Sequence, residues 1–205
     1  NANVSSITFN KYKCNSILKN LGFNCAKSYL YKKDTKLNID FIIRQIQFPC
    51  FIKPNASGSS YGVSKVKKQD EIKDAIENAL KYDKEIIIEE AISGTEVGSG
   101  VFFNGSEIIS LPITEITSEN EFFDFEAKYK GKSKEYTPAR ISQTITNKIK
   151  ETSIQIYQKM NLNGICRIDY IITKKNIPYI IEINTIPGLT QESIIPQQIN
   201  AASLK

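Results

Sequence analysis

Polar and apolar residues alternate most clearly in two short stretches of the chain, 165–173 and 177–183. Both stretches are rich in β-branched and aromatic residues, and a polar Lys-Lys-Asn segment separates them. This pattern predicts two antiparallel strands joined by a tight turn. Because the two strands are so close in sequence, their register can be predicted as well.

The predicted hairpin has one polar and one apolar face. A turn centred on the polar segment places Asp169 opposite Glu182 and Arg167 opposite Asn184. Side chains two residues apart share a face of a strand, so these four side chains should point the same way. The other face is predicted to join the core and carries Ile168, Tyr170, Ile181 and Ile183.

Two directly opposed carboxylates repel each other unless a cation lies between them. Asp169, Glu182 and the amide oxygen of Asn184 form a set of oxygen donors that suits Mg²⁺, which takes its other ligands from water and substrate phosphates. The alternative is an exposed hairpin face on which Arg167 and nearby lysines supply the countercharge. The hairpin alone leaves both interpretations open.

The rest of the chain alternates between short helices and short strands. In the helix predicted over 38–47, we expect Phe41, Ile42 and Ile46 to face the core. Asn104-Gly105 is typical of a type I′ turn between two strands. Helices are predicted over 10–21, 38–47, 70–81 and 142–160, and strands over 50–54, 63–66, 85–91, 97–103 and 107–113.

A loop of small polar residues, 55–62, joins two of these strands. Its backbone N–H groups and hydroxyls suit a phosphate, although no helix beginning Gly-Lys-Ser/Thr follows, so it is not a Walker loop. A plain flexible loop is the alternative, and Lys53 at the end of the preceding strand favours phosphate. Lys11 lies in a first helical turn, where a cation is unfavourable unless an anionic ligand is near. A surface lysine is the other interpretation of Lys11.

Composition narrows the possible functions. The chain has 205 residues, 40% of them hydrophobic and 24% charged, which suits one large or two small soluble domains. No signal peptide is visible, and no apolar run approaches the roughly 20 residues of a membrane span. The net charge of +5 comes from scattered lysines, so we expect no nucleic-acid partner.

Two residue types add to this picture. Histidine is absent, which excludes Ser-His-Asp and Cys-His catalysis and His-ligated zinc within this chain. The four cysteines are far apart without a C-x-x-C motif, which favours a reduced, cytoplasmic protein.

Six segments, taken together and in order, resemble the ATP-grasp ligases and most closely the D-alanine–D-alanine ligase family. Each segment is weakly specific alone, but the six occur with fitting spacing along nearly the whole chain from Lys11 onward. They are FIKPNASGSSYGVSKV (51–66), IEEAISGTE (88–96), FFDFEAKY (122–129), TPAR (137–140), GICRIDY (164–170) and EINTIPGLTQESIIPQQ (182–198).

The resemblance implies an α+β fold in which two α+β subdomains hold ATP between them. The hydrophobic pattern breaks near Glu96, so we predict one subdomain over residues 1–95 and another, with the metal and catalytic residues, over 96–205. The reaction implied is phosphorylation of the carboxylate of one D-alanine, followed by attack of the amine of a second D-alanine on the acyl phosphate, for peptidoglycan precursor synthesis.

The resemblance also implies how ATP is bound. Lys11 and Lys53 match the lysines that hold its phosphates. Ser59 and Ser60 lie on the loop that closes over them, and Lys128 would reach the γ-phosphate.

The nucleoside contacts implied by the family lie further along the chain. Glu89, Glu90 and Ile92 would line the adenine pocket, largely through backbone groups, and Glu96 would bind the ribose hydroxyls. Glu90 stands where some relatives have lysine, a change with little effect if the backbone makes the contact. Tyr129 would link its own loop to loop 55–62, which we call the serine loop.

The remaining implied roles concern the metal and the reaction. Asp169, Glu182 and Asn184 match the residues that hold two Mg²⁺ ions, for which Mn²⁺ could substitute. Arg167 and the backbone amide of Gly188 would stabilise the oxyanion of the intermediate.

The serines and the tyrosine complete the implied site. Ser193 would hold the carboxylate of the second amino acid, and Ser59 and Tyr129 would complete the closed, catalytic site.

Members of the family carry a further N-terminal domain that supplies part of the first amino-acid site and through which they often dimerise. Nothing in this chain corresponds to it, so we expect the chain by itself to be inactive and the full-length protein to be a homodimer. A nucleotide-binding module without catalysis and a ligase using D-lactate or D-serine as second substrate are the alternatives.

Overall fold

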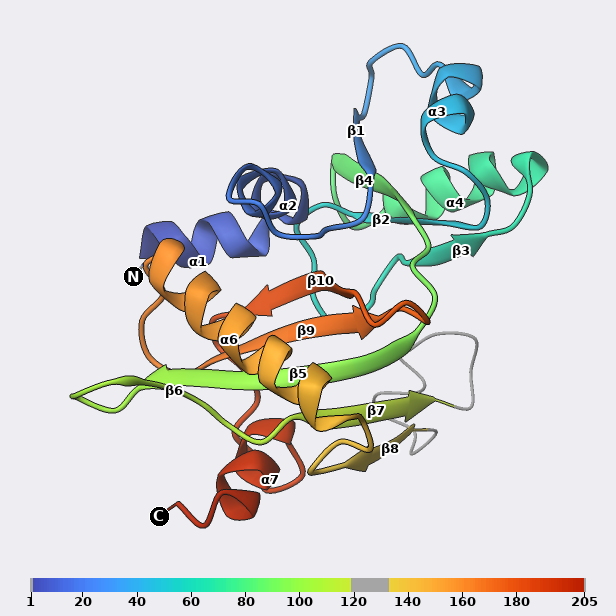
Figure 1. The fold of residues 1–205 in the computed structure, drawn as a ribbon. Coiled ribbons are helices and arrows are strands. Elements are labelled where there is room, and N and C mark those ends of the chain that lie inside the picture. The colour runs from blue at the N-terminus through green and yellow to red at the C-terminus, as the bar shows by residue number, and fades with distance from the viewer. Residues whose placement is uncertain (1, 119–132, 205) are drawn as a thin grey trace.

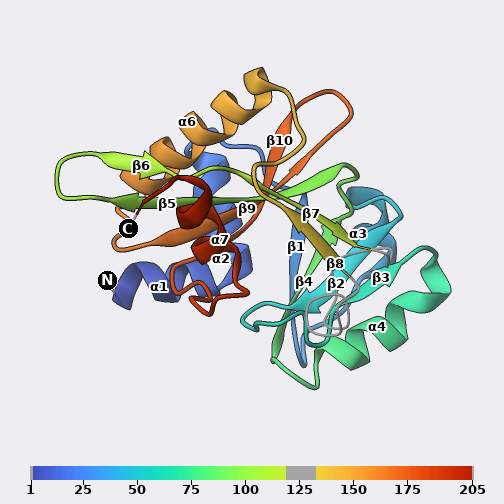
Figure 2. The ribbon, with the colours of Figure 1, turned by 90° about the horizontal axis from the view of Figure 1, so that it is seen from below.

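The computed structural model describes residues 2–118 and 133–204, which form two antiparallel sheets with helices packed against them (Figures 1 and 2). The smaller sheet has the strand order β1-β4-β2-β3, and the larger has the order β10-β9-β5-β7-β8, with β6 paired to β5. The α+β architecture predicted from the sequence is confirmed.

The smaller sheet carries two short α-helices. The helix predicted over 70–81 corresponds to α4, which follows a turn of 3-10 helix and packs its buried side chains against β2 and β3. The elements are β1 (Ser28–Lys32), α3 (Ile39–Gln45), β2 (Cys50–Pro54), β3 (Ser64–Val66), the 3-10 helix (Gln69–Glu71), α4 (Ile72–Ala79) and β4 (Glu85–Glu90).

The larger sheet lies between helices. The Ser153 hydroxyl of α6 donates to the Ser99 hydroxyl of β5 at 2.9 Å, and the Gln198 side chain of α7 accepts from the backbone N–H of the next residue, Gly100. Helices α6 and α7 cover opposite faces of β5 (Figure 1). The elements are α1 (Ala2–Phe9), α2 (Lys11–Asn20), β5 (Thr95–Phe103), β6 (Ile108–Ser110), β7 (Thr114–Ser118), β8 (Ser133–Tyr136), α6 (Gln143–Lys159), β9 (Cys166–Ile172), β10 (Pro178–Asn184) and α7 (Ile194–Ala201).

Side-chain caps fix where three helices begin. Asn10, Asn38 and Ser142 each accept a hydrogen bond from a backbone N–H in the first turn of α2, α3 and α6. A cap satisfies one of the N–H groups that have no partner within the helix. The predicted starts of these three helices are confirmed to within a residue.

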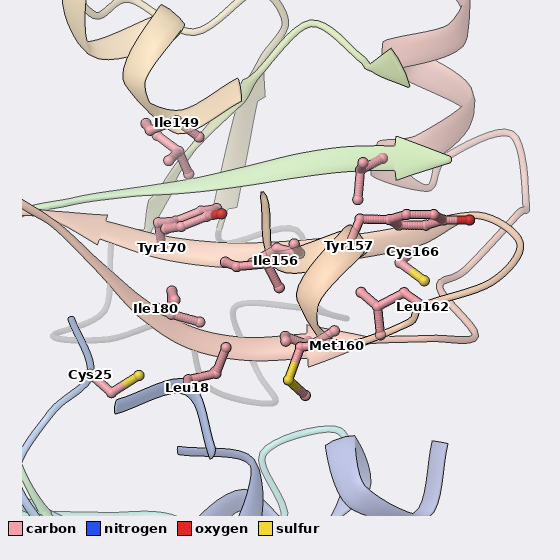
Figure 3. Packing of buried hydrophobic residues seen from close by; sticks show 14 of the residues in the cluster. Leu18, Cys25, Ile149, Ile156, Tyr157, Met160, Leu162, Cys166, Tyr170 and Ile180 are labelled. Carbon is pink, nitrogen blue, oxygen red and sulfur yellow. The ribbon is translucent and has the colours of Figure 1, made fainter. Parts of the chain in front are cut away.

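Two apolar cores correspond to the two sheets. Residues between Ile42 and Ile88 form the smaller core. The larger core includes not only α6, β9 and β10 but also Leu18 and Cys25, which pack beside Ile180 of β10 (Figure 3). The chain changes sheets between β4 and β5, where we predicted a boundary, but its first 25 residues contribute apolar side chains to the larger core.

The hairpin of β9 and β10 has the predicted register at its functional end. Asp169 pairs with Glu182, and Arg167 pairs with Asn184. Closer to the turn, the register shifts by one residue, and Ile181 is left without a partner. Ile181 therefore lines a cavity beside Glu182, and Ile180 takes its place in the core at 2% exposure. The prediction that Ile181 faces the core is wrong.

Two local predictions also fail. Phe41 is 47% exposed and meets the ring of Tyr29 edge-on, while Ile42 and Ile46 are buried in the smaller core and Ile39 and Ile43 pack against it. Between β5 and β6, Gly105 has φ +102°, but Asn104 does not share this left-handed conformation, so the turn is not type I′. The Asn104 side chain instead accepts backbone hydrogen bonds from the two residues after the glycine, a local bond that replaces the tight turn.

All four cysteines are free, as their spacing predicted, and all four are buried. Burial raises the pKa of Cys14 and Cys25 to about 12 and that of Cys50 and Cys166 to about 11. Among the residues described, no helix has both the length and the apolar character needed to cross a bilayer.

Candidate functional site

A cavity of about 160 Å³ lies between the two sheets and collects most of the predicted nucleotide-binding residues. From the smaller sheet come Lys53, the serine loop and the end of β4, and from the larger sheet come β5, β9 and β10. The predicted site residues that line it are Lys11, Lys53, Ser59, Ser60, Glu89, Glu90, Ile92, Glu96, Arg167, Asp169 and Glu182.

Lys53 and Glu89 form an ion pair at the base of this cavity. They lie on the adjacent strands β2 and β4, and their side chains are only 10% and 8% exposed. A buried lysine would be very costly without a partner, and the carboxylate meets that need. The sequence indicated Lys53 for phosphate binding but gave no sign that the side chain of Glu89 would pair with it.

Lys11 connects the serine loop to the hairpin. Its Nζ atom donates to the backbone carbonyl of Ser57 at 2.8 Å and to Glu182 Oε1, also at 2.8 Å. Helix α2 begins beside the loop, since the Lys11 N–H donates to the Asn55 carbonyl and the Asn55 side chain accepts from the next N–H. This cation therefore lies where the predicted phosphate loop and the acidic strand meet.

Arg167, Asp169 and Asn184 form a hydrogen-bonded cluster on the polar face of the hairpin. The guanidinium donates twice to Asp169, with nitrogen–oxygen distances of 2.7 and 2.9 Å, and the Asn184 amide donates to the same carboxylate at 2.9 Å. The adjacent Asp169 raises the pKa of Arg167. Arg167 and Lys11 thus supply the countercharge that the opposed carboxylates need, as one of the two interpretations of the hairpin expected.

The serine loop has an unusual backbone. Ser59 and Ser60 have φ of 52° and 58°, and Gly62 has φ of 70°. The left-handed conformation is unfavourable for serine and clusters at binding sites in proteins. The loop brings both serines to the first cavity, and Ser59 also reaches a second cavity.

This second cavity, of about 860 Å³, adjoins the first along the hairpin. Arg167 and Glu182 line both cavities, whereas Asn184, Gly188 and Ser193 line only the second. Ser193 is the residue before α7, and its hydroxyl lies 2.9 Å from that of Thr190. The residues predicted to bind the amino-acid substrate are therefore brought together next to the residues predicted to bind the nucleotide.

Some site residues were missed by sequence reasoning. Ile171 and Ile181 form an apolar wall of the first cavity, and the half-buried Glu135 lines the second. The alternation of β9 could have indicated Ile171, but neither Ile181 at the register shift nor Glu135 on a short edge strand carries a local signal. The predicted residues Lys128 and Tyr129 lie outside the described residues.

Glu90 lines the first cavity. Its carboxylate accepts a hydrogen bond from the Lys27 backbone N–H at 2.8 Å, which ties β4 to the segment before β1. The side chain thus has a structural role within the chain.

Solved structures with the same fold define the class. The chain superposes on the VanG D-Ala:D-Ser ligase from Enterococcus faecalis with a TM-score of 0.88 and 34% identity, over 98% of this chain and 59% of that one. It also superposes on the D-alanine–D-alanine ligase from Bacillus anthracis complexed with ATP, with a TM-score of 0.82, 28% identity, and 98% and 62% coverage. Two sheets with a cavity between them, together with these neighbours, define an ATP-grasp fold, as the sequence predicted.

Sequence comparison identifies the family within this class. The family model described as the C-terminus of D-ala D-ala ligase matches residues 17–205. The D-alanine–D-alanine ligase of Flavobacterium johnsoniae is 51% identical over 98% of this chain, and that of Phocaeicola vulgatus is 44% identical over 100%. The chain belongs to the D-alanine–D-alanine ligase family. It spans 62% and 63% of the length of these two relatives.

Proposed function

We propose that this chain provides the ATP-binding and catalytic part of a ligase that joins two D-alanine molecules at the expense of ATP. The observation that carries the proposal is the convergence of two lysines, the serine loop and the acidic hairpin on one cavity between two sheets. The family membership supports D-alanine as the substrate, because the relatives are D-alanine–D-alanine ligases.

Charge placement supports phosphoryl transfer in this cavity. Such transfer depends mainly on positioning and on electrostatic stabilisation of the phosphates. Lys11 and Lys53 carry the positive charge, and Ser59 and Ser60 offer hydroxyls and backbone N–H groups. The apolar wall of Ile171 and Ile181 would take the nucleobase.

The donor set of the hairpin fits a magnesium site. Asp169, Glu182 and Asn184 lie together on one strand face and offer carboxylate and amide oxygens, the donors that Mg²⁺ prefers. We propose that they hold two Mg²⁺ ions, or Mn²⁺ in their place. The bound ions would neutralise charge on the phosphates, while Lys11 and Arg167 keep the carboxylates paired in the free protein.

The second cavity is the proposed site of the amino-acid chemistry. Arg167 and the Gly188 backbone N–H would stabilise the oxyanion that forms when the amine of the second D-alanine attacks the acyl phosphate. Ser193 would hold the carboxylate of that second D-alanine. Lys128 and Tyr129 keep their proposed roles at the γ-phosphate and in closing the site.

We further propose that the full-length protein is a cytoplasmic homodimer that supplies the dipeptide for peptidoglycan and so supports cell-wall formation and cell shape. The four free, buried thiols suit a reducing compartment. A second candidate is a D-alanine–D-serine ligase, because the VanG D-Ala:D-Ser ligase is 34% identical with a TM-score of 0.88. A nucleotide-binding module without catalysis is the other alternative.

The test measures ADP release and dipeptide formation by the full-length protein. ADP release should require both D-alanine and Mg²⁺, and the product should be D-alanyl-D-alanine. Release of ADP without D-alanine, or preference for D-serine as second substrate, would contradict the proposal. ATP binding without any product would favour the non-catalytic alternative.

Asp169→Asn tests the metal site. The substitution keeps the size of the side chain and one acceptor for Arg167, but it removes a negative charge. It should abolish the Mg²⁺ dependence of ATP affinity and lower the rate of ADP release by at least about tenfold. Asp70→Asn, at an exposed ion pair with Lys68, is the matched control and should leave both unchanged.

A further inference from the structure

Glu135 lies on β8 at the rim of the second cavity, and neither the hydrophobic pattern nor the family motifs pointed to it. Strand register pairs it with Ile116 of β7, which lines the nucleotide cavity, so both face the ligand side of the larger sheet. The Glu135 side chain lines the second cavity together with Arg167 and Ser193. It therefore borders the region proposed for the amino-acid substrates.

The negative charge of Glu135 is not balanced within the described part of the chain. Its Oε2 atom accepts a hydrogen bond from the Gln197 side-chain amide at 2.5 Å, and that amide also donates to the Glu192 carbonyl at 3.1 Å. An amide donor is neutral. Among the residues that the structure describes, no lysine or arginine forms an ion pair with Glu135.

The nearby guanidinium of Arg167 does not change this balance, because it is committed to Asp169 through two hydrogen bonds. Burial raises the pKa of Glu135, and the Gln197 hydrogen bond and Arg167 oppose that rise. A half-buried carboxylate held by a neutral donor at the rim of a cavity is suited to a cationic ligand group.

The position of Glu135 indicates which ligand group this is. Gln197 lies one helical turn after Ser193, and its backbone N–H donates to the Ser193 carbonyl at 3.3 Å. Glu135 and Ser193 are thus linked to the same turn of α7. Ser193 is the proposed contact of the second carboxylate, and an α-amino acid carries its ammonium group two bonds away from that carboxylate.

We propose that Glu135 binds the ammonium group of the second amino acid and so selects an amino acid over a 2-hydroxy acid at this site. This inference rests on the proposed ligase function. A carboxylate binds an ammonium group through charge-assisted hydrogen bonds, whereas the hydroxyl of D-lactate is neutral and gains less from the same contact.

The variant Glu135→Gln isolates the charge. The glutamine keeps an oxygen that can accept the Gln197 hydrogen bond, so the link between β8 and α7 is preserved. In the full-length protein, KM for the second D-alanine should rise about tenfold or more, the range expected for a hydrogen bond to a charged group. The preference for D-alanine over D-lactate should fall by a similar factor, and KM for ATP should stay within about twofold of the unmodified value.

Two further variants separate charge from structure. Gln197→Leu removes the link but keeps the Glu135 charge, and Glu107→Gln neutralises an exposed carboxylate in the turn between β5 and β6. The proposal expects both to keep the preference for D-alanine over D-lactate. A loss of that preference in Gln197→Leu, with an unchanged Glu135→Gln protein, would overturn the proposal and leave Glu135 a structural role only.

The unmodified protein provides a check that needs no variant to fold. With D-alanine as first substrate, kcat/KM for D-alanine as second substrate should exceed that for D-lactate by at least about tenfold, and a ratio near one would overturn the proposal. Absence of D-alanine-dependent ADP release from the unmodified protein would refute the ligase function itself. Normal release together with an unchanged KM in Glu135→Gln would refute only the role of Glu135.

Discussion

The ion pair between Lys53 and Glu89 leads to a prediction that separates stability from nucleotide binding. Both side chains are about nine-tenths buried, at 10% and 8% exposure, so solvent screens their interaction little. Replacing one partner leaves a buried, unpaired charge. Lys53→Met and Glu89→Leu should each lower the free energy of unfolding by about 3–5 kcal/mol.

The double variant is the decisive comparison. Two apolar side chains of similar size can replace a buried ion pair at little cost, so Lys53→Met/Glu89→Leu should recover most of the stability lost in the single variants. If the lysine also holds a phosphate, the double variant should still bind ATP at least about tenfold more weakly. The second substitution would then restore stability without restoring ATP binding.

Equilibrium urea unfolding measures the first effect, and calorimetric titration with ATP measures the second. For a denaturant slope of about 2–3 kcal/mol per molar urea, each single variant should lower the midpoint by about 1–2.5 M. Lys68→Met, at an ion pair in which both side chains are 67% exposed, is the control and should leave the midpoint unchanged. The reasoning is refuted if Lys53→Met is as stable as the unmodified chain, or if the double variant is less stable than both single variants.

Three further predictions concern packing, acid stability and thiol reactivity. Gly100→Ala should destabilise the fold by about 1–3 kcal/mol in urea unfolding, because the added carbon would lie 2.8 Å from Ile195, whereas Gly58→Ala has nothing within 4 Å and should be neutral. The hydrogen bond from Arg140 lowers the pKa of Glu115 below its usual range, so this ion pair stabilises the fold at neutral pH and loses its effect as the carboxylate is protonated. The difference in free energy of unfolding between the unmodified chain and Arg140→Gln should therefore be present at pH 7 and shrink as the pH falls through the folded-state pKa of Glu115. Because burial raises the four thiol pKa values to between about 11 and 12, a thiol reagent at pH 8 should label the folded chain slowly and the unfolded chain completely; rapid labelling of the folded chain would contradict the burial.

Local sequence was sufficient for much of the site. The pairing of Asp169 with Glu182 follows from the short turn between the two strands and from the polar–apolar alternation along each strand. Both signals come from neighbouring residues in the sequence. Capping by Asn10 and the small residues around Ser59 are likewise local signals. The structure brings these segments to one cavity, as the order of the motifs implied.

The failures share a different cause. Ile181 leaves the core because the strand register shifts, and Phe41 packs edge-on against Tyr29 of β1 instead of entering the core. The partners of Lys53 and the position of Glu135 depend on neighbouring strands that are distant in sequence. Contacts of this kind arise from the tertiary fold, which periodicity and turn propensity do not encode.

The register shift in β10 gives the hairpin two kinds of surface in consecutive residues. In a regular strand, Ile181 and Glu182 would point to opposite sides, and only one could meet a bound molecule. Here the apolar side chain of Ile181 and the acidic side chain of Glu182 both line the first cavity. Such a surface suits a ligand that is flat and apolar at one end and highly charged at the other. Deleting Ile181 would restore regular pairing and at the same time remove one of the two isoleucines that form the apolar wall of the pocket.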